Sequence, residues 1–176
     1  MLSNFILMIF IVGVSIGVAL SIIGVSSPNW LSITGDDKKV HWNSLISCAK
    51  IDNKEANFCR SVWETASDWM KATLALIIIG VLSSLAAIVW SCIVCFACCF
   101  KSCLGPPLPF LAGLAFATHL SACCIYGTRV VDIHWNEVVK EPFHQLGWGY
   151  ILVIISTAVY FIDIIFGILV VLFVEF

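Results

Sequence analysis

Charged side chains are scarce in this chain: Asp, Glu, Lys and Arg make up 11% of its 176 residues, whereas hydrophobic residues make up 61%. Soluble globular domains carry about a quarter charged residues, so this composition excludes an ordinary water-soluble fold. No polar stretch is long enough to form a separate soluble domain. We therefore interpret residues 1–176 as a single integral membrane domain.

Four apolar stretches account for most of the chain and predict its membrane-spanning helices. Each meets or approaches the roughly 20 residues that an α-helix needs to cross about 30 Å of hydrocarbon. The first lies where a signal peptide would, but its apolar run is long and no basic residue precedes it, so we expect it to be retained. The predicted fold is an all-α membrane protein with spans at about 5–25, 72–96, 108–128 and 147–174.

The polar connections predict how the spans are arranged. With an even number of spans, the long connections 26–71 and 129–146 face one side, and the short connection at about 98–107 shares the other side with both termini. Twelve of the twenty charged residues lie in the first connection, where six basic residues balance six acidic ones. Because these charges cancel, the sequence gives no basis for preferring cations over anions.

Two rules disagree about which side is extracellular. Lys and Arg usually indicate cytoplasmic loops, yet eight of the nine lie in the two long connections. Cys48 and Cys59 lie in the first of these connections, where a disulfide between them would require an oxidising compartment. Such a bond would stabilise the loop by about 2–3 kcal/mol on chain-entropy grounds. We give the cysteines more weight, and expect the long connections to be extracellular and the termini cytoplasmic.

The first connection also has the pattern of a β-hairpin. The β-prone run 30–34, the turn residues 35–37 and the alternating run 40–48 would pair as antiparallel strands. A further turn would return the chain and bring the thiol of Cys59 near that of Cys48.

The second long connection predicts one more strand, because apolar side chains alternate there with polar ones. Its apolar members are Val131, Ile133 and Trp135. Three further tryptophans, Trp30, Trp69 and Trp148, lie near the outer ends of the spans. Amphipathic rings prefer the headgroup layer, so we predict that these three anchor the chain at the membrane surface.

Several motifs resemble the superfamily of claudins and peripheral myelin protein. They are Pro28-Asn29-Trp30 after the first span, Trp42, the pair Cys48 and Cys59, Arg60 directly after the second cysteine, and "LGWGYILVI" at 146–154. The resemblance extends over the whole layout of four spans, a long first loop and a shorter second outer loop. The resemblance is to the superfamily and not to a typical claudin. In the stretch His41-Trp42-Asn43 the tryptophan is separated from Cys48 by five residues, and the chain ends at Val174-Glu175-Phe176.

This resemblance implies a left-handed four-helix bundle capped by a small extracellular antiparallel β-sheet from both outer loops, with a structural disulfide between Cys48 and Cys59. It implies no catalytic residue, cofactor or metal, and the loops offer no nucleophile, base or ligand cluster of their own. Members form intercellular barriers or pores, mediate adhesion, shape membranes, or accompany channels and receptors.

The segment "CIVCFACCFKSC" at 92–103 contains five of the nine cysteines of the chain. Cysteines next to a cytoplasmic helix end suit S-palmitoylation, and the candidates are Cys92, Cys95, Cys98, Cys99 and Cys103. The alternatives are inert small apolar residues, or metal binding or redox exchange through overlapping CxxC patterns. A membrane thiol oxidoreductase is the enzyme alternative, but a full span separates these thiols from the cysteines of the first loop.

Two features within the spans predict contacts inside the membrane. Gly13, Gly17 and Ser21 recur at every fourth position and would let another helix approach closely, either in this bundle or in a partner. Asp163 is the only charged residue within the fourth span, and a carboxylate in hydrocarbon needs a partner, water or a proton. His119 in the third span is a candidate partner for it.

Two functions fit these observations. The first is a claudin-like junction or adhesion protein at the plasma membrane, which affects paracellular permeability and associates with copies of itself within and between cells. The second is an auxiliary subunit of a channel or receptor. Either protein would bind the lipid bilayer, and we expect neither nucleic acid nor a small-molecule substrate.

Overall fold

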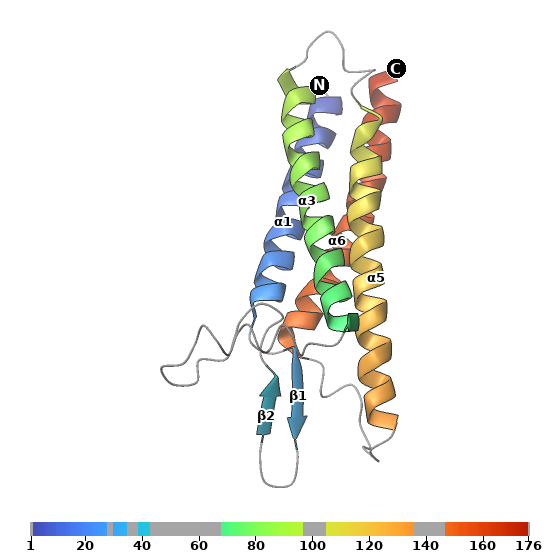
Figure 1. Ribbon diagram of the computed structural model, residues 1–176. Coiled ribbons are helices and arrows are strands. Elements are labelled where there is room, and N and C mark those ends of the chain that lie inside the picture. Colours follow the sequence, from blue (N-terminus) through green and yellow to red (C-terminus); the bar gives the residue numbers. More distant parts are fainter. Residues whose placement is uncertain are drawn as a thin grey trace.

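The computed structural model describes residues 2–27, 30–34, 39–42, 68–96, 105–135 and 147–175. Within these ranges the chain forms four long helices and a β-hairpin (Figure 1). The elements are α1 (Leu2–Ser26), β1 (Leu31–Thr34), β2 (Lys39–Trp42), α3 (Asp68–Phe96), α5 (Pro107–Trp135) and α6 (Trp148–Glu175). As predicted, each of these helices is long and apolar enough to cross a membrane, in the segments Phe5–Ser26, Asp68–Phe96, Pro107–Arg129 and Trp148–Phe173.

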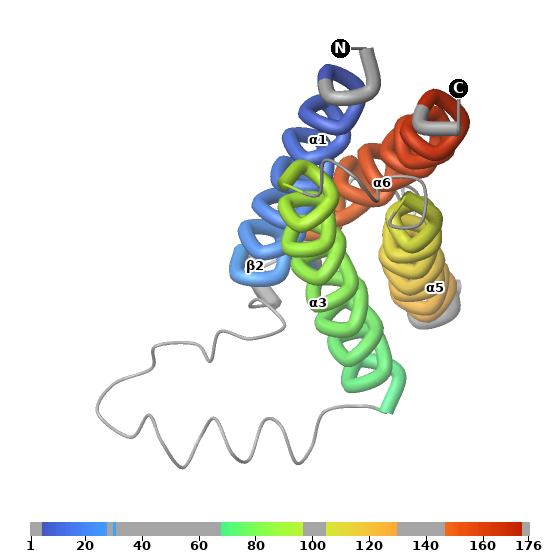
Figure 2. The backbone as a smooth tube through the Cα atoms, turned by 90° about the horizontal axis from the view of Figure 1, so that it is seen from above, coloured from blue at the N-terminus to red at the C-terminus, as the bar shows by residue number. Residues whose placement is uncertain are grey.

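The four helices form a bundle in which each packs on two neighbours. Helix α1 lies beside α3 and α6, and α5 lies beside the same two helices, so that α1 and α5 face each other across a diagonal (Figure 2). Both chain ends lie at one end of the bundle, together with the end of α3 and the start of α5, and the hairpin lies at the other end (Figure 1).

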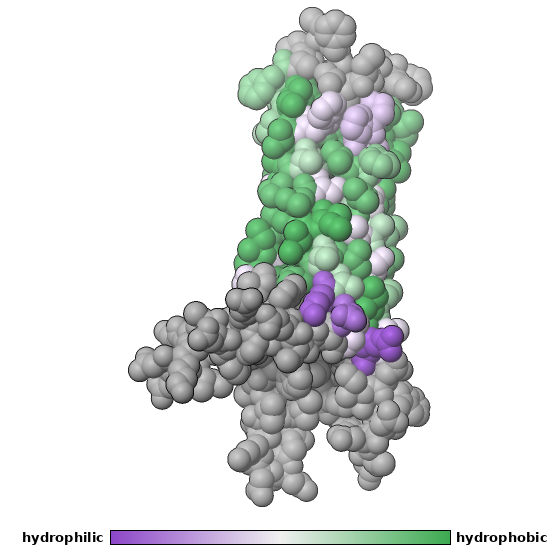
Figure 3. Space-filling view, viewed as in Figure 1, coloured by the Kyte–Doolittle hydropathy of each residue, from purple (hydrophilic) through white to green (hydrophobic). Residues whose placement is uncertain are grey.

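The bundle exposes many large apolar side chains and buries many of its polar ones. Figure 3 shows an apolar band around the helices, with hydrophilic residues near the hairpin end. Exposed residues include Val12, Ile16, Leu82, Val89, Phe161 and Ile162, whereas Ser21, Ser84, His119, Ser156 and Asp163 are buried. In lipid there is no hydrophobic drive between helices, so close packing and hydrogen bonds hold them together. The distribution of side chains therefore suits a membrane-embedded bundle.

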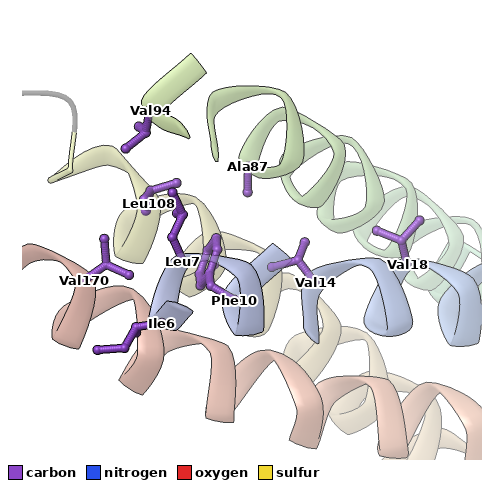
Figure 4. Close-up of a cluster of buried hydrophobic side chains, with 10 residues drawn as sticks. Ile6, Leu7, Phe10, Val14, Val18, Ala87, Val94, Leu108 and Val170 are labelled. Atoms are coloured by element: carbon purple, nitrogen blue, oxygen red, sulfur yellow. The ribbon is translucent and has the colours of Figure 1, made fainter. Parts of the chain in front are cut away.

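Two apolar clusters occupy the two ends of the interior. At the end that carries both termini, side chains from all four helices converge (Figure 4). This cluster comprises Ile6, Leu7, Phe10, Val14, Val18, Ala87, Val94, Leu108, Ala112 and Val170. The cluster at the hairpin end comprises Val25, Trp30, Leu74, Ile77, Ala122, Cys123, Tyr126, Tyr150 and Val153. Most buried polar side chains, among them Ser21, Ser84, His119, Ser156 and Asp163, lie between the two clusters along their helices.

Helix α1 packs on α6 through small residues, which lets the two antiparallel helices approach closely. An added Cβ on any of the glycines in this seam would press on α6. The pairs are Gly13 with Asp163, Gly17 with Tyr160, Ser21 with Ser156, and Gly24 with Gly149 and Val153. The stripe of small residues on α1 therefore packs against α6 of the same chain.

The hairpin directly follows α1. Strands β1 and β2 pair antiparallel with Leu31 opposite Trp42 and Thr34 opposite Lys39. The strand expected in the second long connection is wrong, because residues 131–135 continue α5 to Trp135. Each residue added to an existing helix gains a hydrogen bond without a new nucleation cost, whereas a strand would need an edge to pair with. Among the described residues, the second connection therefore adds no strand to β1 and β2, and the predicted sheet from both connections is not seen.

The seam predicts opposite effects for two glycine substitutions. In Gly17→Ala the new methyl group would lie 2.6 Å from Cε1 of Tyr160, whereas at Gly113 nothing lies within 4 Å of it. We expect Gly17→Ala to lower the free energy of unfolding by about 1–3 kcal/mol through overpacking. Gly113→Ala should be neutral or raise it by up to about 1 kcal/mol through helix propensity. Unfolding of the purified protein in detergent measures both, and equal melting temperatures for the two variants would contradict the packing described.

Candidate functional site in the helix core

His119 lies at the centre of the bundle and touches all four helices. It belongs to α5 and is completely buried. Its Nε2 lies 2.9 Å from Oγ of Ser21 on α1, across the diagonal of the bundle. Its ring meets the Tyr160 ring of α6 edge to face, with centroids 5.0 Å apart. On α3, an added Cβ at Gly80 would overlap the imidazole, so the absence of a side chain there makes room for it.

The partners of His119 determine which nitrogen carries hydrogen. Nδ1 lies 2.9 Å from the carbonyl oxygen of Ala115, one turn earlier in α5. A carbonyl only accepts hydrogen bonds, so we infer that Nδ1 donates. In the neutral imidazole Nε2 then accepts. Oγ of Ser21 lies 2.9 Å from this nitrogen and also 2.9 Å from the carbonyl oxygen of Gly17 in its own helix, and it has one hydrogen for these two acceptors.

A second serine completes the polar layer. Ser156 of α6 donates to the carbonyl oxygen of Gly17 at 2.8 Å, and its Oγ lies 2.7 Å from Oγ of Ser21. The Tyr160 hydroxyl lies 3.5 Å from the same Ser21 oxygen. Three helices thus share one hydrogen-bond network, which we call the core network: Ser21, His119, Ser156, Tyr160 and the Gly17 carbonyl.

The Ser21 and His119 pair has the spacing of a nucleophile and its general base, but its surroundings indicate a structural role. A substrate atom must reach within about 3 Å of the nucleophile, whereas Ser21, His119 and Ser156 are all fully buried. The group that orients the histidine is a backbone carbonyl in place of a carboxylate. The core network therefore joins helices and has no open face toward a reacting molecule.

Asp163 lies one turn from Tyr160 along α6, with 1% of its surface exposed. Its side chain packs against Gly13 of α1, and its Oδ2 has no hydrogen-bond partner among the described residues. The suggested pairing with His119 is not formed, since both nitrogens of that ring are engaged by Ser21 and Ala115. The helix register places His119 beside Tyr160 and leaves Asp163 facing the glycine.

Aromatic rings fill the bundle at its hairpin end. The Trp30 ring meets those of Tyr126 and Tyr150 at centroid distances of 5.1 and 6.3 Å, and Trp69 meets Tyr126 at 5.8 Å. Trp30 is only 2% exposed, so its predicted role as a surface anchor is wrong. Its indole N–H finds a partner inside the protein, the carbonyl oxygen of Gly24 at 2.8 Å, which removes the need for headgroups or water.

Trp30 also joins the first connection to the start of α6. The N–H of Gly147 donates to the carbonyl oxygen of Trp30 at 3.0 Å. Gly149 has no side chain to collide with the indole, and Tyr150 donates to the carbonyl oxygen of Cys123 at 3.0 Å. By contrast, Trp148 is 71% exposed, as a membrane anchor would be.

The remaining candidate residues divide by position. Cys92 and Cys95 are free and exposed near the end of α3, at the end of the bundle with both termini. Trp42 ends β2. Outside the described residues lie Cys48, Cys59, Arg60, Cys98, Cys99 and Cys103. Among the described residues, no group of three or more His, Cys, Asp or Glu side chains could hold a metal ion.

The sequence contained part of this arrangement. The spacing of Gly13, Gly17 and Ser21 indicated a close helix contact, and these residues do lie against α6. Ser156 and Tyr160 were missed, although their spacing of four residues places them on one helical face, with Asp163 three residues further.

No protein-family model, curated protein or solved structure matches this chain.

The core network predicts unequal roles for two serines of α1. Ser21→Ala removes a hydroxyl that contacts two other helices. We expect it to lower the free energy of unfolding by about 0.6–1.7 kcal/mol, between the average and the maximum for interhelical hydrogen bonds in membranes. Ser15→Ala is the matched control, because Ser15 is exposed and bonds only to the Ile11 carbonyl of its own helix. Chemical denaturation in mixed micelles measures the difference. Equal stability of the two variants would refute the role assigned to the network.

Proposed function

We propose that this chain is a claudin-like protein of the plasma membrane that contributes to contacts between neighbouring cells and affects the permeability of the space between them. Its loops 26–71 and 129–146 would be extracellular and its termini cytoplasmic, with the four helices in a left-handed bundle. Its partners would be the bilayer and further copies of the chain, within one membrane and across the gap. The proposal assigns it no catalytic reaction, cofactor or nucleic acid.

One observation carries this proposal. The two stretches that resemble the superfamily, Pro28-Asn29-Trp30 and residues 146–154, are far apart in the sequence. In the structure they meet, through the Gly147 to Trp30 hydrogen bond and the contact of the indole with Gly149. A shared motif whose halves fit together is stronger support than two separate similarities in sequence.

The position of the hairpin also supports a role in contact. It projects from the end of the bundle opposite both termini, where an extracellular hairpin could reach another surface (Figure 1). Its first strand begins directly after Trp30, which the aromatic cluster holds in place. The hairpin therefore starts from a fixed point on the bundle.

Expression in epithelial cells that lack junction strands tests the proposal. We expect the chain to concentrate at cell borders and to change transepithelial resistance, because outer loops on facing cells would associate. Diffuse surface staining with unchanged resistance would contradict a junction role.

A pair of tryptophan variants sharpens this experiment. Trp30→Ala removes the buried indole that fixes the start of the hairpin, so enrichment at cell borders should fall in protein that still reaches the surface. Trp148→Ala changes an exposed side chain of the same type and should retain enrichment. Surface biotinylation separates loss of contact from loss of delivery.

The second candidate is an auxiliary subunit of a channel or receptor, and Asp163 is the observation that favours it. Intramembrane carboxyl groups commonly serve binding or transport, and Oδ2 of this one has no partner among the described residues. A partner helix with a basic or hydroxyl side chain could satisfy it if α1 moved aside.

Asp163→Asn tests this second role while preserving the shape of the side chain. If Asp163 binds a partner, native electrophoresis of detergent-solubilised membranes should show a smaller complex and lower surface delivery. Asp68→Asn is the matched control, because the same change falls on an exposed residue at the first turn of α3. Unchanged complex size, delivery and activity in Asp163→Asn would exclude the binding role.

A further inference from the structure

Asp163 places a carboxyl group inside the seam between α1 and α6. Only 1% of its surface is exposed. A Cβ added to Gly13 of α1 would overlap Oδ1 and would lie 3.2 Å from Oδ2, so the carboxyl group packs against the backbone of α1. Oδ2 has no hydrogen-bond partner among the described residues. The stripe of small residues on α1 therefore receives, at this level, an acidic side chain with an unsatisfied oxygen.

In the described part of the chain, no basic side chain pairs with this carboxyl group. Helix α6 packs on α1 and α5, and Leu2–Ser26 of α1 contains no ionisable side chain. On α5 the ionisable group nearest this level is His119, whose two nitrogens are engaged by Ser21 and Ala115. On α6 it is Tyr160, whose ring packs on that of His119. Glu175 ends α6, and the other charged or buried ionisable residues of the helices lie toward the hairpin end: Asp68, Lys71, Cys123, Tyr126, Arg129, Asp132 and Tyr150.

The contact with Gly13 limits what can neutralise the carboxyl group. No water molecule or metal ion fits between it and α1, because even one carbon added at Gly13 would overlap Oδ1. Hard cations take several oxygen ligands. In the described residues, however, no group of three or more His, Cys, Asp or Glu side chains could hold a metal ion. A proton needs neither this space nor further ligands.

We propose that Asp163 is a proton-binding site: in the folded bundle its carboxyl group is protonated and uncharged, and this form packs against Gly13. A buried carboxylate without a partner is unfavourable in hydrocarbon, whereas the neutral acid loses much less on leaving water. Release of the proton to water would therefore require α1 and α6 to separate at Gly13, so that water reaches the carboxylate. This site goes beyond the junction role proposed above and does not depend on it.

Proton binding and closure of the seam are thereby coupled. The closed bundle holds a proton that the open or unfolded form releases, so the free energy of unfolding falls as the pH rises. Gly17 and Tyr160 meet one turn further along the same seam. Separation of the helices at Gly13 would therefore also loosen the core network.

Infrared spectroscopy of the purified full-length protein in lipid vesicles tests the protonation. A protonated carboxylic acid has a carbonyl band that a carboxylate lacks, and exposed carboxyl groups are ionised at neutral pH. We expect the acid band in the wild-type protein at neutral pH and its loss in Asp163→Asn. Asp68→Asn is the matched control and should retain the band, because Asp68 is exposed at the start of α3.

Thermal unfolding at a series of pH values tests the coupling. From about pH 6 to about pH 9, we expect the melting temperature of the wild-type protein to fall by about 3 °C or more beyond any change in Asp163→Asn, since only the wild type loses this proton. All other titrating groups are common to both proteins, so their effects cancel in the comparison. Asp68→Asn should follow the wild type.

Absence of the acid band in the wild type, or its survival in Asp163→Asn, would overturn the proton site. Equal pH dependence of melting in these two proteins would overturn its coupling to the seam. If Asp163→Asn does not fold, ¹³C labelling of aspartate decides from the wild-type protein: an acid band that shifts with the label supports the site, and one that does not shift excludes it. Enrichment at cell borders is measured separately, so a failure here leaves the junction role standing.

Discussion

The hydrogen bond between His119 and Ser21 joins α1 and α5, one of the two diagonal pairs of helices, across the centre of the bundle. Apolar burial cannot favour one helix arrangement over another when lipid surrounds them all, so a directional bond of this kind selects the register. Each surrounding feature accommodates it. Gly80 has no side chain, which leaves space for the imidazole. The Ala115 carbonyl accepts the hydrogen bond from Nδ1, and the Tyr160 ring packs against the imidazole.

The small residues of α1 follow from the same constraint. Ser21 reaches His119 only if α1 lies close to the centre of the bundle. At the same level, Ser156 and Tyr160 of α6 also contact Ser21. A bulky side chain at Gly17 would push Tyr160 outward and lengthen these bonds. The seam and the core network therefore depend on each other. The glycines allow the short distance between α1 and α6, and the hydroxyl groups form hydrogen bonds across that distance.

Sequence alone predicted the features that depend on single segments. The spans follow from their length and composition, and the antiparallel pairing of β1 and β2 follows from the β-prone run 30–34 and the alternating run that begins at residue 40. Features that depend on two segments could not be read in this way. The register of α5 against α1 and α6 decides whether His119 contacts Ser21 or Asp163. This register cannot be read from the sequence of one helix alone. Trp30 suits a membrane surface and a buried pocket equally by its chemistry, and only Gly149 on a distant helix makes the pocket.

The core network also bears on the hairpin end of the protein, because α1 joins the two. From Ser21 the helix runs through Gly24, whose carbonyl holds the Trp30 indole, and the Trp30 carbonyl holds the start of α6. Trp30 lies only nine positions after the buried Ser21, and β1 begins at the next residue. A change in the distance between α1 and α6 at Ser21 would therefore move the base of the hairpin. The base of the hairpin is held by contacts inside the bundle, so the packing of the bundle determines how the hairpin is presented.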